Sequence, residues 1–170
     1  MHSIELMNSV SITFEHAVIV RGAGVQGEVL SLPPKPTGYA GDMSPDVACA
    51  LWKSGAAVLV DVRTDAERDW VGFIPGAKAI AWKQWPAMDI NPLFDDALTE
   101  AVQPCGTRVK VLFICRSGVR SIAAARRATE LGLDIEAYNV LEGFEGNLDE
   151  SAHRGNISGW RSRALPWKQT

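Results

Sequence analysis

The stretch V-L-F-I-C-R-S-G-V-R-S-I-A-A-A occupies residues 111–125 and joins an apolar run, a polar loop and an alanine-rich segment. The run from Lys110 to Cys115 predicts a strand buried on both faces, because it lacks the alternation of a half-exposed strand. The alanine-rich segment predicts a helix from about Ser121 to Leu131. A buried strand followed by a polar loop and a helix is typical of an α/β fold.

Strand and helix signals alternate on both sides of this stretch. A second apolar run, A-V-L-V-D-V at residues 57–62, predicts another buried strand. Shorter candidate strands are K-A-I-A-W near residue 80 and I-E-A-Y-N-V at residues 135–140. Helix starts are indicated by Ser44-Pro45, by a capping box from Thr64 to Glu67, and by Asn91-Pro92. We therefore expect a mainly parallel central sheet with helices on both faces.

Prolines divide the chain near its start. Residues 31–38 read S-L-P-P-K-P-T-G, and three prolines in four positions prevent both a helix and a central strand. We expect residues 1–37 to form an N-terminal extension and proline-rich linker, with one short strand around residues 17–20, and residues 38–170 to form a single domain. A G-x-G-x-x-G pattern lies within residues 18–27, but the prolines follow too soon for the helix of a dinucleotide site.

The composition limits the classes of function. The chain of 170 residues has 17 basic and 20 acidic side chains, and this net charge of −3 does not favour nucleic acid as a partner. No stretch approaches the roughly 18 apolar residues of a membrane helix, and no secretory signal is recognisable, so we expect a cytoplasmic protein without a membrane partner. The three cysteines, Cys49, Cys105 and Cys115, form no C-x-x-C pair, which favours reduced thiols and neither a metal nor a cofactor.

Cys115 ends the predicted strand at the edge where open parallel sheets place their ligands. Ser117 and Gly118 allow the following main chain to curl, so that successive N–H groups and the start of the next helix face an anion. Arg116 and Arg120 add positive charge. A cysteine at this place is most often a core residue, but the polar loop favours a nucleophile. We predict that Cys115 is a thiolate at neutral pH and reacts without a dedicated base.

Three stretches of the chain together resemble the rhodanese family. Residues 58–80 carry an Asp-x-Arg after a strand, an acidic helix and a turn into Pro-Gly-Ala. Residues 111–121 resemble the family's active-site loop, with the cysteine first, and residues 138–146 (Y-N-V-L-E-G-F-E-G) resemble its closing signature. The resemblance covers roughly residues 38–170 and implies a single-domain rhodanese-like fold.

The resemblance also implies an activity and its residues. Cys115 would take a sulfane sulfur from thiosulfate or a similar small anionic donor and carry it as a cysteine persulfide. A thiol, cyanide or a protein acceptor would then remove the sulfur, as in a thiosulfate:cyanide sulfurtransferase. The residues expected to bind the substrate are Arg116, Ser117, Gly118, Val119 and Arg120. The residues expected to support the loop are Asp61, Arg63 and Ser121.

Two other functions within this family remain open. The chain could relay persulfide sulfur from a protein donor, or it could be a non-catalytic rhodanese-like binding module, which the presence of Cys115 argues against. Phosphatase activity is disfavoured, because related cysteine-dependent phosphatases have one residue more than the four between Cys115 and Arg120. The two loop arginines favour a dianionic donor.

Aromatic residues raise two further expectations. The closing signature often has paired glycines, whereas here Gly143 is followed by Phe144, which predicts an aromatic wall in the pocket. Near the C-terminus, Trp160, Arg161 and Trp167 either pack onto the domain or line the mouth of the site. We favour packing, with arginine stacked on tryptophan.

Overall fold

The computed structural model describes residues 38–169. The predictions for residues 1–37, namely the extension and linker, the short strand and the exclusion of a dinucleotide site, lie outside the described residues. Among the described residues, no helix has the length and apolar character needed to cross a membrane.

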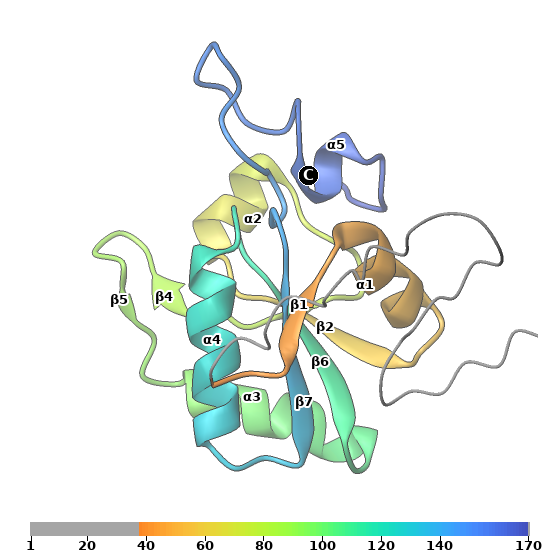
Figure 1. Ribbon diagram of the computed structural model, residues 1–170. Coiled ribbons are helices and arrows are strands. Elements are labelled where there is room, and N and C mark those ends of the chain that lie inside the picture. The colour runs from red at the N-terminus through yellow and green to blue at the C-terminus, as the bar shows by residue number, and fades with distance from the viewer. Residues whose placement is uncertain (1–37, 170) are drawn as a thin grey trace, which may run out of the picture. The chain divides into compact units, whose positions relative to one another are not determined.

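The centre of the domain is a parallel five-stranded sheet with the strand order β1-β7-β6-β2-β3 (Figure 1). Its strands are β1 (Gly41–Met43), β2 (Ala57–Asp61), β3 (Lys78–Ala79), β6 (Val109–Ile114) and β7 (Ile135–Val140). The two long apolar runs of the sequence, β2 and β6, pair in register from Ala57 opposite Lys110 to Asp61 opposite Ile114. The predicted parallel sheet is confirmed, because these runs lie in its interior and are buried on both faces.

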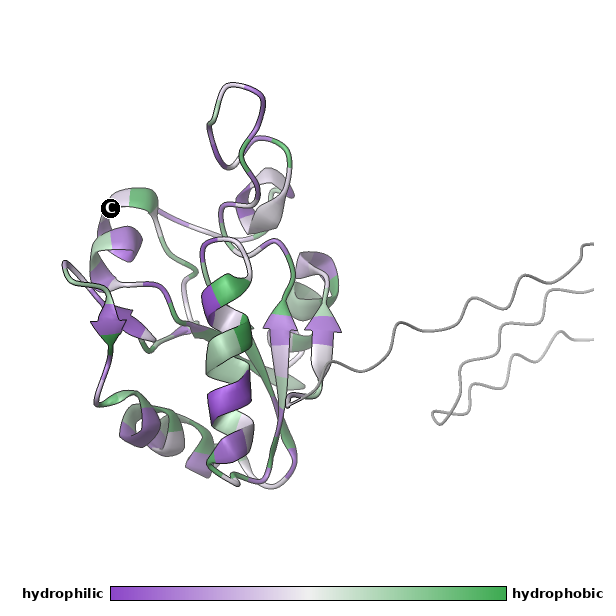
Figure 2. Ribbon diagram, turned by 60° about the vertical axis from the view of Figure 1, so that its left-hand side comes forward, coloured by the Kyte–Doolittle hydropathy of each residue, from purple (hydrophilic) through white to green (hydrophobic). Residues whose placement is uncertain are grey.

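Helices cover both faces of the sheet. The helices are α1 (Pro45–Lys53), α2 (Asp65–Val71), α3 (Phe94–Val102), α4 (Val119–Glu130) and α5 (Gly159–Ser162), with a 3₁₀ turn at Gln103–Cys105. Val60 of β2 and Phe113 of β6 pack with α3 and α4, whereas Leu59 and Leu112 pack with α1 and α5. In Figure 2, α4 runs down the middle of the view with hydrophilic and hydrophobic patches, as expected of a helix that covers one face.

Several element boundaries differ from the predictions. The Ser44 cap of α1 and the Thr64–Glu67 capping box of α2 are confirmed. In contrast, α4 begins at Val119, two residues before the predicted Ser121. The third helix begins at Phe94 because the Asn91 side chain accepts a hydrogen bond from the Leu93 amide and closes a turn before the helix.

Two short features were missed by the sequence analysis. Strand β1 has three residues and pairs with the outer side of β7. A small antiparallel hairpin, β4 (Lys83–Gln84) with β5 (Asp89–Ile90), separates β3 from α3. Its strands have two residues each, too few to produce a periodic pattern in the sequence.

Candidate active site

Cys115 follows β6 directly, at the edge of the sheet where the strands end. Its side chain is 1% exposed, and its Sγ accepts hydrogen bonds from the Gly118 amide at 3.1 Å and from the Ser121 hydroxyl at 3.3 Å. Above it lies a half-open cavity of about 540 Å³. The lining residues are Thr64, Glu67, Trp85, Met88, Cys115, Arg116, Ser117, Val119 and Arg120. The sulfur therefore lies at the floor of a cavity, within hydrogen-bond distance of the Gly118 amide and of the Ser121 hydroxyl, whose single proton also has the Gly118 carbonyl and Asn139 Oδ1 within reach.

Four residues, 115–118, connect strand β6 to helix α4, and we call this segment the cysteine loop. This short connection is possible because Gly118 has a φ of 104°, a left-handed conformation that is easy only for glycine. Since α4 begins at Val119, Ser121 lies in its first turn, which brings the Ser121 hydroxyl to the sulfur. The earlier helix start thus explains how Ser121 reaches Cys115.

The closing turn (residues 142–146) follows β7 and holds the cysteine loop from the other side. The amides of Phe144 and Glu145 donate to the carbonyl oxygens of Cys115 and Arg116, at 2.7 and 2.9 Å. A trans peptide directs its C=O and N–H to opposite sides, so the amides that follow these carbonyls point away from the closing turn. Gly143 permits this approach, because a Cβ there would lie 2.5 Å from the Cys115 carbonyl oxygen.

The expectation that Phe144 forms an aromatic wall of the pocket is wrong. Phe144 is fully buried and does not line the cavity above Cys115. Its ring contacts the Arg63 guanidinium at 3.7 Å and the Trp167 ring at 6.0 Å, on the core side of the closing turn. The ring turns inward because its backbone amide is engaged by the cysteine loop and the adjacent core contains Trp160.

Asp61 and Arg63, both predicted to support the loop, form a buried ion pair. Arg63 Nη2 lies 2.6 Å from Asp61 Oδ2, Arg63 Nε lies 3.0 Å from Asp61 Oδ1, and Nη2 also donates to the Gly72 carbonyl. Through its stacking on Phe144, Arg63 contacts the residue whose amide holds the Cys115 carbonyl. The pair is thus one residue removed from the cysteine loop.

Arg120 lines the cavity, but its charge is already paired. Its guanidinium contacts both carboxylate oxygens of Glu67, at 2.5 and 2.6 Å, and the two side chains are 14% and 19% exposed. Burial alone would raise the pKa of Glu67, but hydrogen bonds from Arg120 and Thr64 outweigh it and lower this pKa to about 2. Arg116 is exposed and forms no ion pair within residues 38–169. The cavity therefore presents less free positive charge than its two arginines suggest.

A chain of hydrogen-bonded polar groups leads from the sulfur through the buried Ser121 and Asn139 to the exposed Asp42 of β1. Ser121 Oγ lies 2.6 Å from Asn139 Oδ1, and Asn139 Nδ2 donates to Asp42 Oδ1 at 2.8 Å. Tyr39 donates to the same carboxylate oxygen at 3.1 Å. Sequence analysis missed Asn139, although a buried amide in the strand I-E-A-Y-N-V was a signal, since such groups need hydrogen-bond partners.

The C-terminal aromatic residues pack onto the domain, as favoured from the sequence. Trp160 is fully buried, its ring meets Trp52 edge-on at 6.2 Å, and its Nε1 donates to the Pro166 carbonyl. The Arg161 guanidinium lies 4.4 Å from the centroid of Trp167. None of the three lines the cavity above Cys115.

The remaining cysteines lie away from the cavity. Cys49 is buried in α1 and belongs to the core, as predicted. Cys105 is exposed in the turn before β6, whereas Cys115 follows the other end of that strand. A six-residue strand spans roughly 20 Å, too far for a disulfide.

Comparison with known proteins agrees with this architecture. The family model described as a rhodanese-like domain matches residues 44–150. An uncharacterised protein of Rickettsia conorii is 33% identical over 114 residues, which cover 66% of this chain and 83% of that protein. A second, from Rickettsia prowazekii, is 33% identical over 112 residues with the same coverage. The crystal structure of Rv0390 from M. tuberculosis is 41% identical with a TM-score of 0.65, covering 78% of this chain and 99% of that one.

The matched residues include the three stretches in which the sequence resembles rhodaneses, and both the family and the fold predictions are confirmed. This chain belongs to the rhodanese-like domain family.

Proposed function

We propose that the chain is a sulfurtransferase that carries sulfur as a persulfide on Cys115. The Cys115 thiolate attacks the outer sulfur of thiosulfate, a new S–S bond forms, and the bond to the inner sulfur breaks, so that sulfite leaves with the electron pair. An acceptor thiolate or cyanide then attacks the outer sulfur of the persulfide. The second step releases the new persulfide or thiocyanate and returns Cys115 to the thiolate.

The observation that carries this proposal is the environment of the Cys115 sulfur. The Gly118 amide and the Ser121 hydroxyl lie within hydrogen-bond distance, and α4 directs its amino end toward the same atom. Hydrogen-bond donors and a helix amino end stabilise a thiolate and the negative charge that returns to it when sulfur leaves. A cysteine with only a packing role is expected to be surrounded by core side chains, whereas Cys115 lines a cavity of about 540 Å³.

Donor binding would involve the cysteine loop and the exposed Arg116 side chain, which forms no ion pair within residues 38–169. We propose that Arg116 and the main chain of Ser117, Gly118 and Val119 bind the anionic donor, with a smaller contribution from Arg120 because Glu67 neutralises it. Asp61, Arg63 and Ser121 are proposed to hold the loop in place. A reduced Cys115 requires a reducing compartment, so we propose the cytoplasm as the site of action.

Intact mass spectrometry tests the proposal directly. After incubation with thiosulfate and removal of the excess, the protein should gain the mass of one sulfur atom, and cyanide should remove it and release thiocyanate. Cys115→Ser should gain nothing. Cys105→Ser is the matched control, because its thiol is exposed and far from the cavity, and it should load as the wild type does. Loading of Cys115→Ser, or no loading of the wild type, would refute the proposal.

A persulfide relay is the second candidate, and the apolar side chains at the cavity mouth favour it. A relay would turn over slowly with thiosulfate and cyanide, but would accept sulfur quickly from a protein persulfide such as that of a cysteine desulfurase. A non-catalytic binding module would do neither. Measuring both rates on one preparation separates the three functions.

A further inference from the structure

Large apolar side chains are exposed around the mouth of the cavity. Trp85 is 60% exposed and Val119 is 75% exposed, and both line the cavity together with Met88. Trp70 of α2 is 72% exposed, and its ring meets Trp85 edge-on at 6.3 Å. We call Trp70, Trp85, Met88 and Val119 the apolar rim. Three separate elements contribute to it, namely α2, the β4–β5 hairpin and the start of α4.

A small anionic donor leaves the apolar rim unused. Thiosulfate has five non-hydrogen atoms, and at about 30 Å³ for each water-sized atom it would fill less than about 150 Å³. The cavity holds about 540 Å³. An anion also gains nothing from contact with tryptophan and valine, and Arg120 is already paired with Glu67. The apolar rim therefore offers contact area that a larger and partly apolar ligand could cover.

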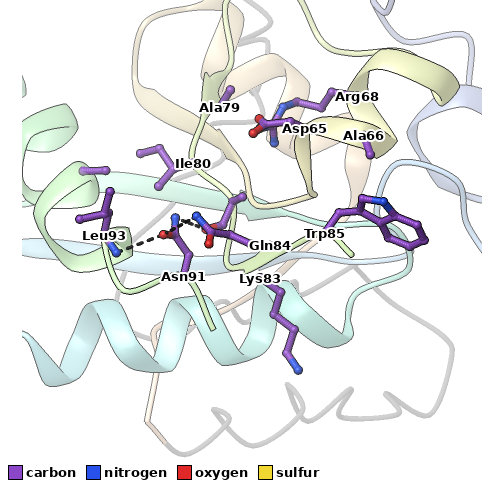
Figure 3. Close-up of a pocket in the computed structure, with 12 residues that line it drawn as sticks. Asp65, Ala66, Arg68, Ala79, Ile80, Lys83, Gln84, Trp85, Asn91 and Leu93 are labelled. Carbon is purple, nitrogen blue, oxygen red and sulfur yellow. Dashed lines mark hydrogen bonds and ion pairs between the residues drawn. The ribbon is translucent and has the colours of Figure 1, made fainter. Parts of the chain in front are cut away.

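The hollowed surface continues past Trp85. A second cavity of about 480 Å³ also has Trp85 as a lining residue, and α2 contributes side chains to both cavities. Figure 3 shows Trp85 standing at one side of this second cavity, with Ile80 and Leu93 at the other. Lys83 and Gln84 add polar groups to its lining, beside the backbone of the edge strand β3. Apolar and hydrogen-bonding surface thus alternate along a path that begins at Cys115.

We propose that the apolar rim docks an extended polypeptide segment that carries the cysteine to which Cys115 passes its sulfur. The segment would place an apolar side chain next to that cysteine, against Trp85 and Val119, and an acidic side chain near Arg116. Arg116 lines the same cavity as these two residues and forms no ion pair within residues 38–169. This inference rests on the proposed persulfide chemistry and names its acceptor.

The dimensions favour a polypeptide over a small apolar thiol. A small thiol bound above Cys115 would reach Trp85 but not Trp70 or the second cavity, whereas an extended chain advances about 3.3 Å per residue and spans all of them. Tryptophan and arginine are the residues that most often dominate binding energy at protein interfaces. Exposed apolar patches of this kind mark interaction sites.

The transfer step balances without another reactant. The thiolate of the docked segment attacks the outer sulfur of the Cys115 persulfide and forms a new S–S bond. The bond between the outer sulfur and Cys115 Sγ breaks, and its electron pair remains on Cys115. The proton of the acceptor thiol has already passed to solvent. One sulfur moves, the acceptor cysteine becomes a persulfide as Cys115 returns to the thiolate, and the two proteins together undergo no net redox change.

Synthetic peptides test the inference. The protein is loaded with thiosulfate, freed of excess and mixed with blocked peptides that contain one cysteine, flanked either by leucine and glutamate or by serine and glutamate. Mass spectrometry follows the loss of sulfur from Cys115. We expect the leucine–glutamate peptide to react about tenfold faster or more, the discrimination that one apolar group in a pocket commonly gives.

The measured quantity is the discrimination ratio, which is the rate with the leucine peptide divided by the rate with the serine peptide. Trp85→Ala should bring the ratio close to one. Ile157→Ala is the matched control, because Ile157 is 61% exposed and lines neither cavity, and it should keep the full ratio. A ratio near one in the wild type, or an equal loss in both variants, would overturn the inference.

Further experiments distinguish a docked polypeptide from a small thiol, from a second copy of the chain, and from an absence of persulfide formation. Benzyl mercaptan and 2-mercaptoethanol are compared as small acceptors. If the ratio of their rates of sulfur removal equals the ratio for the two peptides, the rim binds small apolar thiols and the inference is wrong. If size-exclusion chromatography shows a dimer that Trp85→Ala converts to a monomer, the rim binds a second copy, and the inference is again wrong. Absence of loading by thiosulfate would instead refute the proposed function, whereas loading and cyanide discharge without peptide discrimination refutes only this inference.

Discussion

On the sheet side of the cysteine loop, charged and polar side chains are buried and paired, whereas the apolar rim on the outer side is exposed. Asp61, Arg63 and Asn139 are each at most 1% exposed and hydrogen-bonded. Trp70 and Val119 are each more than 70% exposed. This is the reverse of the usual distribution, in which charged groups face water and large apolar groups face the core.

The two regions serve different requirements. A nucleophile needs fixed neighbours, and buried hydrogen-bonded pairs fix them because each lost bond leaves a costly unsatisfied group. A docking surface needs apolar area that a partner can cover, and it must stay exposed until then. We therefore expect substitutions in the buried region to change stability and persulfide formation, and substitutions in the apolar rim to change the choice of acceptor.

The largest effect is expected for Arg63→Ala, which removes the partner of the buried Asp61 carboxylate. Breaking a buried pair on one side costs about 3–5 kcal/mol of unfolding free energy, because the other charge remains without compensation. Urea denaturation measures the loss. Arg127→Ala is the matched control, since Arg127 forms a similar pair with Asp95 in which the side chains are 40% and 35% exposed. Its loss should be much smaller than that of Arg63→Ala, because exposed ion pairs contribute little to stability, and equal losses in the two variants would show that burial does not distinguish the pairs.

The next effect is expected for Glu67→Gln and depends on pH. The pKa of Glu67 is lowered from 4.5 to about 2, so its ion pair with Arg120 stabilises the folded state fully above about pH 5 and loses this contribution as the pH falls toward 2. The wild type should exceed the variant by roughly 2 to 3 kcal/mol at pH 7, with the difference shrinking at pH 3.

Unfolding in urea at both pH values measures this difference. Glu130→Gln is the control, because Glu130 pairs with Arg127 at an exposed position, and it should show little change at either pH. A Glu67→Gln difference that is the same at pH 3 and pH 7 would contradict the assignment. Because the variant frees the Arg120 charge, the KM for thiosulfate should also fall.

Features that depend on a long local pattern were predicted from the sequence, whereas features that depend on contacts between distant residues were not. The runs at residues 57–62 and 110–115 are long enough for their apolar character to predict buried parallel strands, and Cys115 follows one of them. The pairing of Arg120 with Glu67 joins residues 53 positions apart, and Glu67 already had a sufficient local role in its capping box. Sequence spacing alone therefore left Arg120 as a free cation.

The apolar rim also could not be predicted from sequence patterns. Trp85 lies between the two-residue strands β4 and β5, where no periodicity indicates which way a side chain faces. Asn139 was more accessible to prediction, since an amide in a buried strand must find hydrogen-bond partners. Its partners, Ser121 and Asp42, follow from strand order and from the start of α4, which only the three-dimensional structure provides.

A moderate effect is expected for Ser121→Ala, which removes a hydroxyl 3.3 Å from the Cys115 sulfur. A hydrogen bond to a charged group contributes about 1.5–3 kcal/mol, so persulfide formation and reaction with iodoacetamide should slow about tenfold or more. Thr99→Ala is the control, because its hydroxyl bonds only a carbonyl within α3, and its rates should not change. Unchanged rates in Ser121→Ala would mean that the Ser121 proton serves Asn139 or the Gly118 carbonyl instead.

The smallest effect on the folded protein is expected for Trp70→Ala. Trp70 contacts Trp85 edge-on and is largely exposed, so its removal should change the unfolding free energy by less than about 1 kcal/mol. Loading by thiosulfate and discharge by cyanide should match the wild type, because Trp70 does not line the cavity above Cys115. The preference for a leucine-flanked peptide should fall, though less than in Trp85→Ala, because Trp70 lies farther along the rim. A fall in cyanide discharge with the peptide preference intact would reverse the roles of the two regions, since an exposed aromatic side chain would then act on the chemistry and not on the choice of acceptor.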